Sequence, residues 1–344
     1  MVNSFGKSAL KVLLGLVFIV SAILKVVDMD SFEIYVYSYH FFSLNLSFIV
    51  ARLAIILELV LGIGLISHCL HKMMWWGSVA MLVAYSLLLI YAITLGRTDS
   101  CHCFGDYLQL DPKQSLIKNG VLLVLFLLIY KMESWRTPFR WLILIVAVMA
   151  SSIGIFVASP PDNMTSDYDP EQNLQVELFD AMLDTEPLEA LNLREGKQVV
   201  CFFSTSCEYC QLAAHKLSLM QQFYGFPPER ITYLFMGNEE SVAGFYEQSE
   251  SAQYRDLLYP DMSRLVKVVN GNFPVVVLME DGIVIREYGL RNMKEEEVKS
   301  FFFSGLRLRD FPNKVWIKNV LVISLPHQSN NHGITFWKSK DIEV

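Results

Sequence analysis

The sequence lacks the excess of positive charge that nucleic-acid binding requires. Its 28 lysine and arginine residues are outnumbered by 35 aspartate and glutamate residues, which gives a formal net charge of -7. Proteins hold phosphate backbones with basic surfaces, so nucleic acid is excluded as a partner. Charge of either sign is scarce, at 18% of the 344 residues, whereas 53% are hydrophobic. A chain of this length has room for two domains.

A small-residue cleavage site, which would mark a removable signal peptide, is missing after the first apolar run. That run extends from about residue 12 to residue 27 and contains one charged residue, Lys25. We therefore expect a first transmembrane helix rather than a signal peptide. Apolar residues crowd into the first 160 positions, and most acidic residues follow them. This asymmetry indicates a membrane half and a soluble half.

Five stretches are apolar enough to cross a bilayer, which takes about 20 helical residues. They are residues 9–27, 46–66, 73–95, 116–130 and 139–158. Lysine, arginine and histidine precede the first span and join the second to the third and the fourth to the fifth. The positive-inside rule makes those segments cytoplasmic. It places the loop between the third and fourth spans, and everything after Pro160, on the periplasmic side of a bacterial inner membrane.

Cysteine is also scarce, and four of the six cysteines form two close pairs. Cys101 and Cys103 lie in the loop between the third and fourth spans, and Cys207 and Cys210 follow a strand-length apolar run at 198–204. The odd number of spans puts both pairs on one oxidising side of the membrane, where disulfides persist. This arrangement indicates transfer of electrons between thiols and disulfides.

Metal binding and a purely structural disulfide are the competing interpretations of these cysteines. Neither a second Cys-x-x-Cys nor a histidine pair follows the second cysteine pair at zinc spacing, and the first pair with His102 lacks a fourth ligand. We therefore predict no metal site. His102 either lowers the pKa of a neighbouring thiol when protonated or serves as a turn residue at the membrane surface. We give Cys69 and Cys201 no redox role, since a buried cysteine behaves as a small apolar residue.

Strand and helix patterns alternate across the soluble half. We expect strands at 198–204, 231–236, 273–280 and 283–288, and helices at 207–224, 241–250 and 293–303. Asp281-Gly282 is the signal of a two-residue type I′ hairpin. Cys207 would begin a helix, where backbone N–H groups favour the thiolate, and Cys210 lies one turn later, in position to resolve a mixed disulfide. Pro274 lies at the start of the strand expected at 273–280.

The stretch at 171–303 resembles the thioredoxin-like superfamily, nearer its membrane-tethered extracytoplasmic members than the cytosolic thioredoxins. The resemblance implies that Cys207 is attacked or attacks first and that Cys210 resolves. It also implies that Pro274 has a cis peptide bond, faces the cysteine pair and shapes the client groove. Those proteins usually carry Trp before the first cysteine, and here Ser206 stands in that place. The client preference therefore remains open.

Three elements of the membrane half occur in a recognisable order: the helix pattern at 15–25, Glu58-Leu59-Val60-Leu61-Gly62, and Cys101-His102-Cys103-Phe104-Gly105. Over about residues 8–130 they resemble DoxX-like membrane proteins, in particular the methylamine utilisation protein MauE family. The family pattern has Gly where this chain has His102. The resemblance implies a four-helix unit that handles disulfides of extracytoplasmic proteins.

Charged residues inside a span are costly and are functional by default. We expect Arg52 to snorkel from the outer end of its span. Glu58 lies about 16 Å from that end at 1.5 Å per residue, and Lys25 lies about one turn from the outer end of its own span, so a direct pair is not expected. Glu58 is either a proton acceptor beside a bound membrane quinone or a packing residue hydrogen-bonded between helices. The aromatic segment at 32–42 is expected at the outer membrane interface.

The sequence thus predicts a membrane α-helical bundle at 1–160, a linker at 161–172, an α/β thioredoxin-like domain at 173–308 and an extension of unassigned role at 309–344. The leading hypothesis is a thiol–disulfide oxidoreductase that relays electrons between the two cysteine pairs and client proteins, with a membrane quinone as the one cofactor considered. A non-enzymatic assembly or maturation factor is the alternative. A transporter of electrons or solutes is a third, although the spans contain no cysteine pair.

Overall fold

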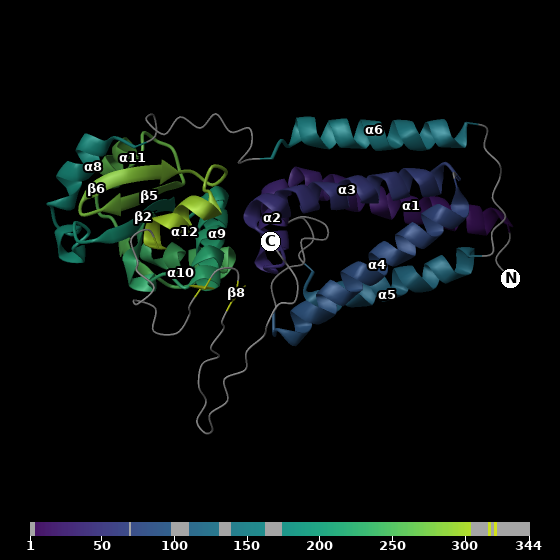
Figure 1. Ribbon diagram of the computed structural model, residues 1–344, viewed down its shortest axis with the longest axis horizontal. Coiled ribbons are helices and arrows are strands. Elements are labelled where there is room, and N and C mark those ends of the chain that lie inside the picture. The colour runs from purple at the N-terminus through teal and green to yellow at the C-terminus, as the bar shows by residue number, and fades with distance from the viewer. Residues whose placement is uncertain are drawn as a thin grey trace, which may run out of the picture.

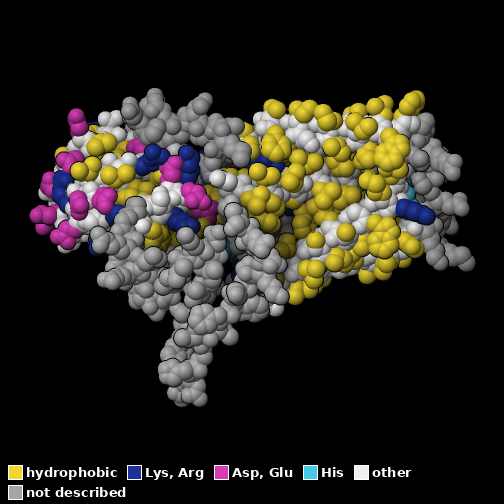
Figure 2. Space-filling model, in the orientation of Figure 1, with side chains coloured by type: hydrophobic (Ala, Val, Ile, Leu, Met, Phe, Trp, Pro, Cys, Tyr) yellow, Lys and Arg dark blue, Asp and Glu magenta, His cyan; other side chains and the backbone are white. Residues whose placement is uncertain are grey.

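The computed structural model describes residues 4–68, 70–97, 110–130, 139–161 and 174–303, together with two short strands at 316–317 and 320–321. A bundle of long helices lies beside an α/β domain (Figure 1). Hydrophobic side chains cover the visible face of the bundle, whereas charged side chains gather on the α/β domain (Figure 2). The loop with Cys101, His102 and Cys103, the segment at 162–173 and most of the C-terminal extension lie outside the described residues.

Among the described residues, five helices are long and apolar enough to cross a membrane, with mean hydropathies of 1.4 to 2.5. They are α1 (Ser4–Val27), α3 (Leu44–Ile66), α4 (His71–Thr94), α5 (Pro112–Ile129) and α6 (Arg140–Ala158). The prediction of five spans is confirmed, and the protein is a multi-pass membrane protein. A shorter helix, α2 (Met29–Ser38), follows α1 at the end of the bundle that faces the α/β domain (Figure 1).

Two glycines fix the contact between α1 and α3. A Cβ atom added to Gly15 would lie 2.8 Å from the carbonyl oxygen of Gly62, and one added to Gly62 would lie equally close to the carbonyl oxygen of Gly15. Small residues let membrane helices approach until their backbones touch. This contact sets how far each helix extends along the other.

The α/β domain is built on one mixed sheet with the strand order β4-β3-β2-β5-β6. Strands β2, β3 and β4 run parallel, and β5 and β6 are antiparallel to their neighbours. The elements in chain order are α8 (Val176–Leu183), a 3-10 turn at Glu189–Leu191, β2 (Lys197–Ser204), α9 (Glu208–Tyr224), a 3-10 turn at Pro228–Arg230, β3 (Ile231–Met236), α10 (Glu239–Ser249), β4 (Arg255–Leu258), α11 (Met262–Val268), β5 (Val275–Glu280), β6 (Ile283–Tyr288) and α12 (Glu295–Phe303).

Helices cover both faces of this sheet. Alternate residues of β2 point to opposite sides: Val199, Cys201 and Phe203 share a buried cluster with side chains of α9, α10 and α12, while Val200 and Phe202 share one with α8 and α11. Between β5 and β6, Asp281 and Gly282 have φ values of 50° and 81°, as a type I′ hairpin requires. The sequence did not predict β4 or α11, because each is short and β4 carries charged residues.

The α/β domain packs directly on the bundle through α2 and the start of α3. Ile34, Tyr37, Leu44 and Phe48 belong to the same buried cluster as the core of α9. Residues 32–42 were expected at the outer membrane interface. Within this segment Phe32, Ile34 and Tyr37 are buried against protein, whereas Phe41 and Phe42, after the end of α2, are exposed. Part of the segment therefore forms a contact between the two domains, and the interface position of the rest stays a prediction.

One carboxylate joins the two domains at this contact. Glu295, the first residue of α12, is 6% exposed. Its side chain accepts hydrogen bonds from the Leu44 backbone N–H at 2.7 Å, from the Tyr37 hydroxyl at 3.2 Å and from the Tyr224 hydroxyl. Three elements, α2, α3 and α9, thus donate to a group on a fourth, which fixes the orientation of the α/β domain on the bundle.

Candidate functional site

The cysteine pair lies where β2 gives way to α9. The backbone N–H of Thr205 donates to the carbonyl of Met236 at 3.0 Å, and that of Cys207 donates to the carbonyl of Ser204 at 3.1 Å. These bonds turn the chain so that Cys207 becomes the N-terminal cap of α9. Its Sγ atom accepts a hydrogen bond from the backbone N–H of Cys210 at 3.4 Å. The sequence prediction of a cysteine opening this helix is confirmed.

The two thiols of the pair differ in reactivity. The hydrogen bond from the Cys210 side chain lowers the pKa of Cys207 most, and the backbone N–H groups of Cys210 and Tyr209 lower it further. Burial and the negative charge of Glu208 raise it, and the resulting pKa is about 6. Cys210 is buried, and burial raises the pKa of its thiol well above the ordinary value, with Cys207 acting in the same direction. Cys207 is therefore the thiolate at neutral pH, and Cys210 keeps its proton.

A proline lies at the same end of the sheet. The Phe273–Pro274 peptide bond is cis, as the sequence predicted. In the antiparallel pairing of β2 with β5, Phe202 lies opposite Val275. Pro274 therefore precedes β5 beside the carboxyl end of β2, from which the chain continues to Cys207. Its role at the client groove stays a prediction.

The third described cysteine has no such surroundings. Cys201 lies in the middle of β2 and is fully buried. Burial raises the pKa of its thiol well above the ordinary value. It serves as a core residue of the sheet, which agrees with giving it no redox role.

The segment leading to the first cysteine pair meets the same end of the bundle as the second pair. Arg97, just after α4, donates to the Ser38 hydroxyl at 2.8 Å, and its guanidinium lies 4.9 Å from the ring centre of Tyr39. Both partners lie at the end of α2, which also packs on α9. Cys101 and Cys103 themselves lie outside the described residues, so their part in a relay stays a prediction.

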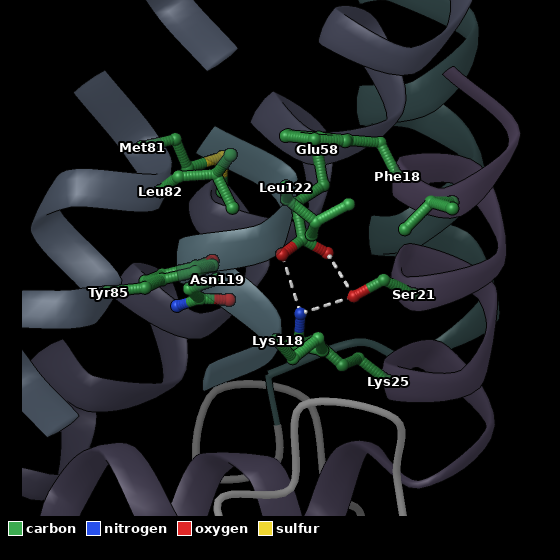
Figure 3. Close-up of a pocket in the computed structure, with 11 residues that line it drawn as sticks. Phe18, Ser21, Lys25, Glu58, Met81, Leu82, Tyr85, Lys118, Asn119 and Leu122 are labelled. Carbon is green, nitrogen blue, oxygen red and sulfur yellow. Dashed lines mark hydrogen bonds and ion pairs between the residues drawn. The ribbon is translucent and has the colours of Figure 1, made fainter. Parts of the chain in front are cut away.

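Inside the bundle, Lys25 and Glu58 form a buried ion pair, which corrects the expectation that they would not meet. The Lys25 ammonium lies 2.6 Å from Oε1 of Glu58 and donates to the Ser21 hydroxyl at 2.9 Å, while that hydroxyl donates to Oε2 of Glu58 at 3.3 Å. Both charged residues are nearly inaccessible, with 2% and 3% of their surface exposed. Figure 3 shows the three side chains pointing toward one another from α1 and α3.

Four helices enclose this ion pair. Tyr85 of α4 and Asn119 of α5 face it from the opposite side of a small cavity (Figure 3). The cavity volume is about 30 Å³, which is room for a water molecule or two. A quinone ring would enter only if the helices moved apart. Of the two roles considered for Glu58, a bond between helices is the one this geometry displays; quinone binding stays a prediction.

Arg52 is the second charged residue whose surroundings differ from expectation. Instead of snorkelling, its side chain is fully buried and bonded to the Glu33 carboxylate of α2. It also donates to the carbonyls of Ser159 and Pro160, each at 2.8 Å. A guanidinium with a fixed fork of donors suits several acceptors at once. Arg52 thereby connects α2 and α3 to the chain leaving α6.

The acidic residues after α1 are the part of the site that sequence reasoning missed. Asp28, Asp30 and Glu33 received no functional role from the sequence. In the structure Glu33 is the partner of Arg52, and Asp30 lies 3.0 Å from the guanidinium of Arg291 in the α/β domain. The sequence did contain a signal. These acidic residues lie close together after the first span, and no basic residue follows Lys25 there to pair with them.

Comparison with known proteins agrees with the membrane part of this picture. Residues 4–132 match the family described as methylamine utilisation protein MauE. A curated relative, Protein TlpB of Flavobacterium psychrophilum, is 24% identical over an alignment that covers 73% of this chain and 82% of that protein. That coverage is larger than the family match alone can supply, so the similarity reaches beyond it. The chain therefore has a MauE-like membrane part followed by an α/β domain.

Proposed function

We propose that this protein is a thiol–disulfide oxidoreductase of a bacterial inner membrane, with a thioredoxin-like α/β domain on the periplasmic side. The observation that carries the proposal is the contrast between two thiols at the start of α9: a half-buried Cys207 with a pKa of about 6 and a buried, protonated Cys210. The mixed sheet with α9 after its central strand, and the cis Pro274 at the same end, support a thioredoxin-like domain.

The exchange follows from this contrast. The Cys207 thiolate attacks one sulfur of a client disulfide; a bond forms between Cys207 and that sulfur, the client S–S bond breaks, and the released client thiolate takes up a proton. Cys210 then loses its proton and attacks Cys207, which forms the Cys207–Cys210 disulfide and expels the second client thiolate. The client gains two electrons and two protons; the cysteine pair supplies both electrons and the proton of Cys210, and water supplies the second proton.

The reverse sequence, with the Cys207–Cys210 disulfide attacked by a client dithiol, uses the same groups. The reduction potentials of the two partners decide which direction prevails. We propose Cys101 and Cys103 as the dithiol or disulfide that exchanges with the α9 pair and restores it. Two cysteines separated by one residue close a small, strained ring that is easily reduced. The contacts of Arg97 with α2 support a shared location at one end of the bundle.

The test uses the full-length protein in lipid nanodiscs. The reduced protein is mixed with a peptide disulfide, and release of the peptide thiol is followed. Replacing Cys207 by Ser should abolish release, because a hydroxyl does not become the attacking anion at neutral pH. Cys201→Ala is the matched control and should retain release, because that cysteine is buried in β2. Full release by Cys207→Ser contradicts the proposal, and inert thiols in the unaltered protein favour a non-enzymatic maturation factor.

A further inference from the structure

A cavity of about 350 Å³ lies between the start of α9 and the junction of α1 with α2. Glu208, Tyr209 and Leu212 line it from α9, and Asp28 and Asp30 are among the residues that line it from the bundle. The first two of the α9 residues directly follow Cys207 in the chain. The cavity therefore opens at the start of α9, one residue from Cys207 in the chain, with one wall from each domain.

The lining combines an apolar wall with carboxylates. Tyr209 is 52% exposed, so its ring is presented to an incoming molecule rather than to the core. Three carboxylates line the cavity, and its described lining residues include no lysine or arginine. Arg291, whose guanidinium lies 3.0 Å from Asp30, demonstrates that a carboxylate at this place holds a guanidinium.

We propose that this cavity binds the part of a client polypeptide next to its reacting cysteine and selects a lysine or arginine there. The inference rests on the proposed oxidoreductase function and names the client class of that site. A volume near the lower end of ligand pockets, which span about 300–1,000 Å³, accepts a few side chains rather than a folded surface. Complementary charge accelerates association and distinguishes partners. The membrane half, through Asp28, thus contributes to client choice.

The probes are two short peptides that differ only in the residues beside one cysteine, Lys in one and Glu in the other. Each cysteine is joined by a disulfide to thionitrobenzoate, a coloured thiol that appears on attack by Cys207. Rates with the full-length reduced protein in neutral-lipid nanodiscs are divided by the rates of the same peptides with dithiothreitol. This division removes the intrinsic reactivity of each peptide. The ratio of the two corrected rates also cancels any change in the reactivity of Cys207.

We expect the lysine peptide to react about fivefold faster, since each exposed ion pair changes an equilibrium by about two- to fivefold. The Asp28→Asn/Glu208→Gln variant should bring the ratio close to one, and Asp28→Lys should reverse it. Asp30 is left unchanged because its ion pair with Arg291 joins the domains. Glu229→Lys is the control of equal charge change, since it raises the net charge by two as both variants do: Glu229 is exposed and precedes the end of β3 that pairs with the start of β2, far from Cys207.

Salt should reduce the preference of the unaltered protein, because screening weakens exposed ion pairs. A ratio of one in the unaltered protein, or a ratio that the Asp28→Asn/Glu208→Gln variant leaves unchanged, overturns the inference. In either case, if release of thionitrobenzoate still depends on Cys207, the proposed oxidoreductase function is retained. If neither peptide reacts with the reduced protein while both react with dithiothreitol, the proposed function itself fails.

Discussion

The lowered pKa of Cys207 makes a quantitative prediction about its reactivity. With an ordinary thiol pKa of about 8.5, only about 3% of the group is thiolate at pH 7; with the pKa of about 6 the fraction is about 90%. A less basic thiolate is also a weaker nucleophile, and a Brønsted slope of about 0.45 removes about tenfold of that gain. At pH 7 Cys207 should therefore react only a few-fold faster than an ordinary thiol. The midpoint of its pH profile is the decisive measurement.

The assay is alkylation of the reduced full-length protein by iodoacetamide between pH 4 and 9, with each cysteine quantified by mass spectrometry. The rate at Cys207 should rise with pH through a midpoint near 6, because the thiolate alone reacts. Cys201, whose pKa burial raises, should stay unmodified throughout. A midpoint near 8.5 for Cys207 in the unaltered protein refutes the assignment of Cys207 as the attacking thiolate.

A pair of substitutions at Cys210 tests the cause of the shift. The hydrogen bond from the Cys210 side chain contributes most to the lowered pKa of Cys207. Cys210→Ala removes that donor and should move the midpoint upward toward 8.5, whereas Cys210→Ser keeps a hydroxyl donor and should move it less. Equal midpoints for Cys210→Ala and the unaltered protein contradict this explanation and leave the backbone N–H groups as the cause.

The same shift links pH to stability. The folded-state pKa lies below the unfolded value of about 8.5, so the contribution is complete above pH 8.5 and disappears as the pH falls through about 6. Lowering the pKa from about 8.5 to about 6 corresponds to ~3.4 kcal/mol, and the partial exposure of Cys207 reduces this to ~1–2 kcal/mol through solvent screening. The reduced protein should therefore lose stability between pH 8.5 and 6 by an amount that Cys207→Ser does not.

Four further predictions concern the rest of the molecule. Glu58→Gln leaves the Lys25 ammonium buried without its carboxylate and should destabilise the bundle by about 3–5 kcal/mol, whereas the double change Lys25→Met/Glu58→Leu should recover most of that loss in thermal unfolding; a double variant as unstable as the single one opposes this account. Glu295→Ala should accelerate amide hydrogen exchange in α2 while leaving the middle of α3 unchanged, and protection of α2 equal to the unaltered protein would count against the interdomain role. Cys210→Ser should accumulate a mixed disulfide with a client on non-reducing gels, and absence of any trapped species would argue against the resolving role. Alkaline phosphatase fused after residue 161 should be active in the periplasm, whereas a cytosolic location would rule out the shared face of the two cysteine pairs.

The parts of the site that sequence reasoning predicted are those encoded by neighbouring residues. An apolar strand followed by Cys207 and Cys210 identifies the start of α9, because a strand, a tight turn and a helix N-terminus each leave a local pattern. Asp281-Gly282 identifies its hairpin for the same reason, and the φ values of both residues confirm it. Five hydropathic runs likewise predict five spans, since a bilayer imposes one length on every helix that crosses it.

The Lys25–Glu58 pair was missed because its geometry depends on how two helices are shifted along each other. The two spans would have to end at one level for Lys25 and Glu58 to lie at different depths. In the structure α3 begins at Leu44, and its first turns extend past the end of α1 to reach Glu295 and the ammonium of Lys216, 5.6 Å from the ring of Phe48. Helical side chains lean toward the N-terminus, so the Lys25 ammonium reaches back one turn to Ser21 and Glu58.

The interdomain contact was missed for a related reason. The periodicity of 29–38 reports that one face of α2 is apolar, but lipid and protein satisfy such a face equally well. What distinguishes them is the set of polar partners brought by distant parts of the chain. Arg52 pairs with Glu33 nineteen residues away, and Tyr37 donates to Glu295, 258 residues away. No local sequence pattern predicts partners that lie so far apart in the chain.

The hydrogen bonds of Glu295 with α2 and α3 have a consequence for how the α/β domain would meet its clients. A domain that swung on a tether would sample a wide volume above the bilayer and could dock on proteins already folded. This domain is held in one orientation on the bundle, with the start of α9 next to the junction of α1 with α2. If the proposed exchange takes place at Cys207, a client polypeptide must bring its cysteine to this fixed site, which favours chains that are still flexible, such as those that have newly crossed the membrane.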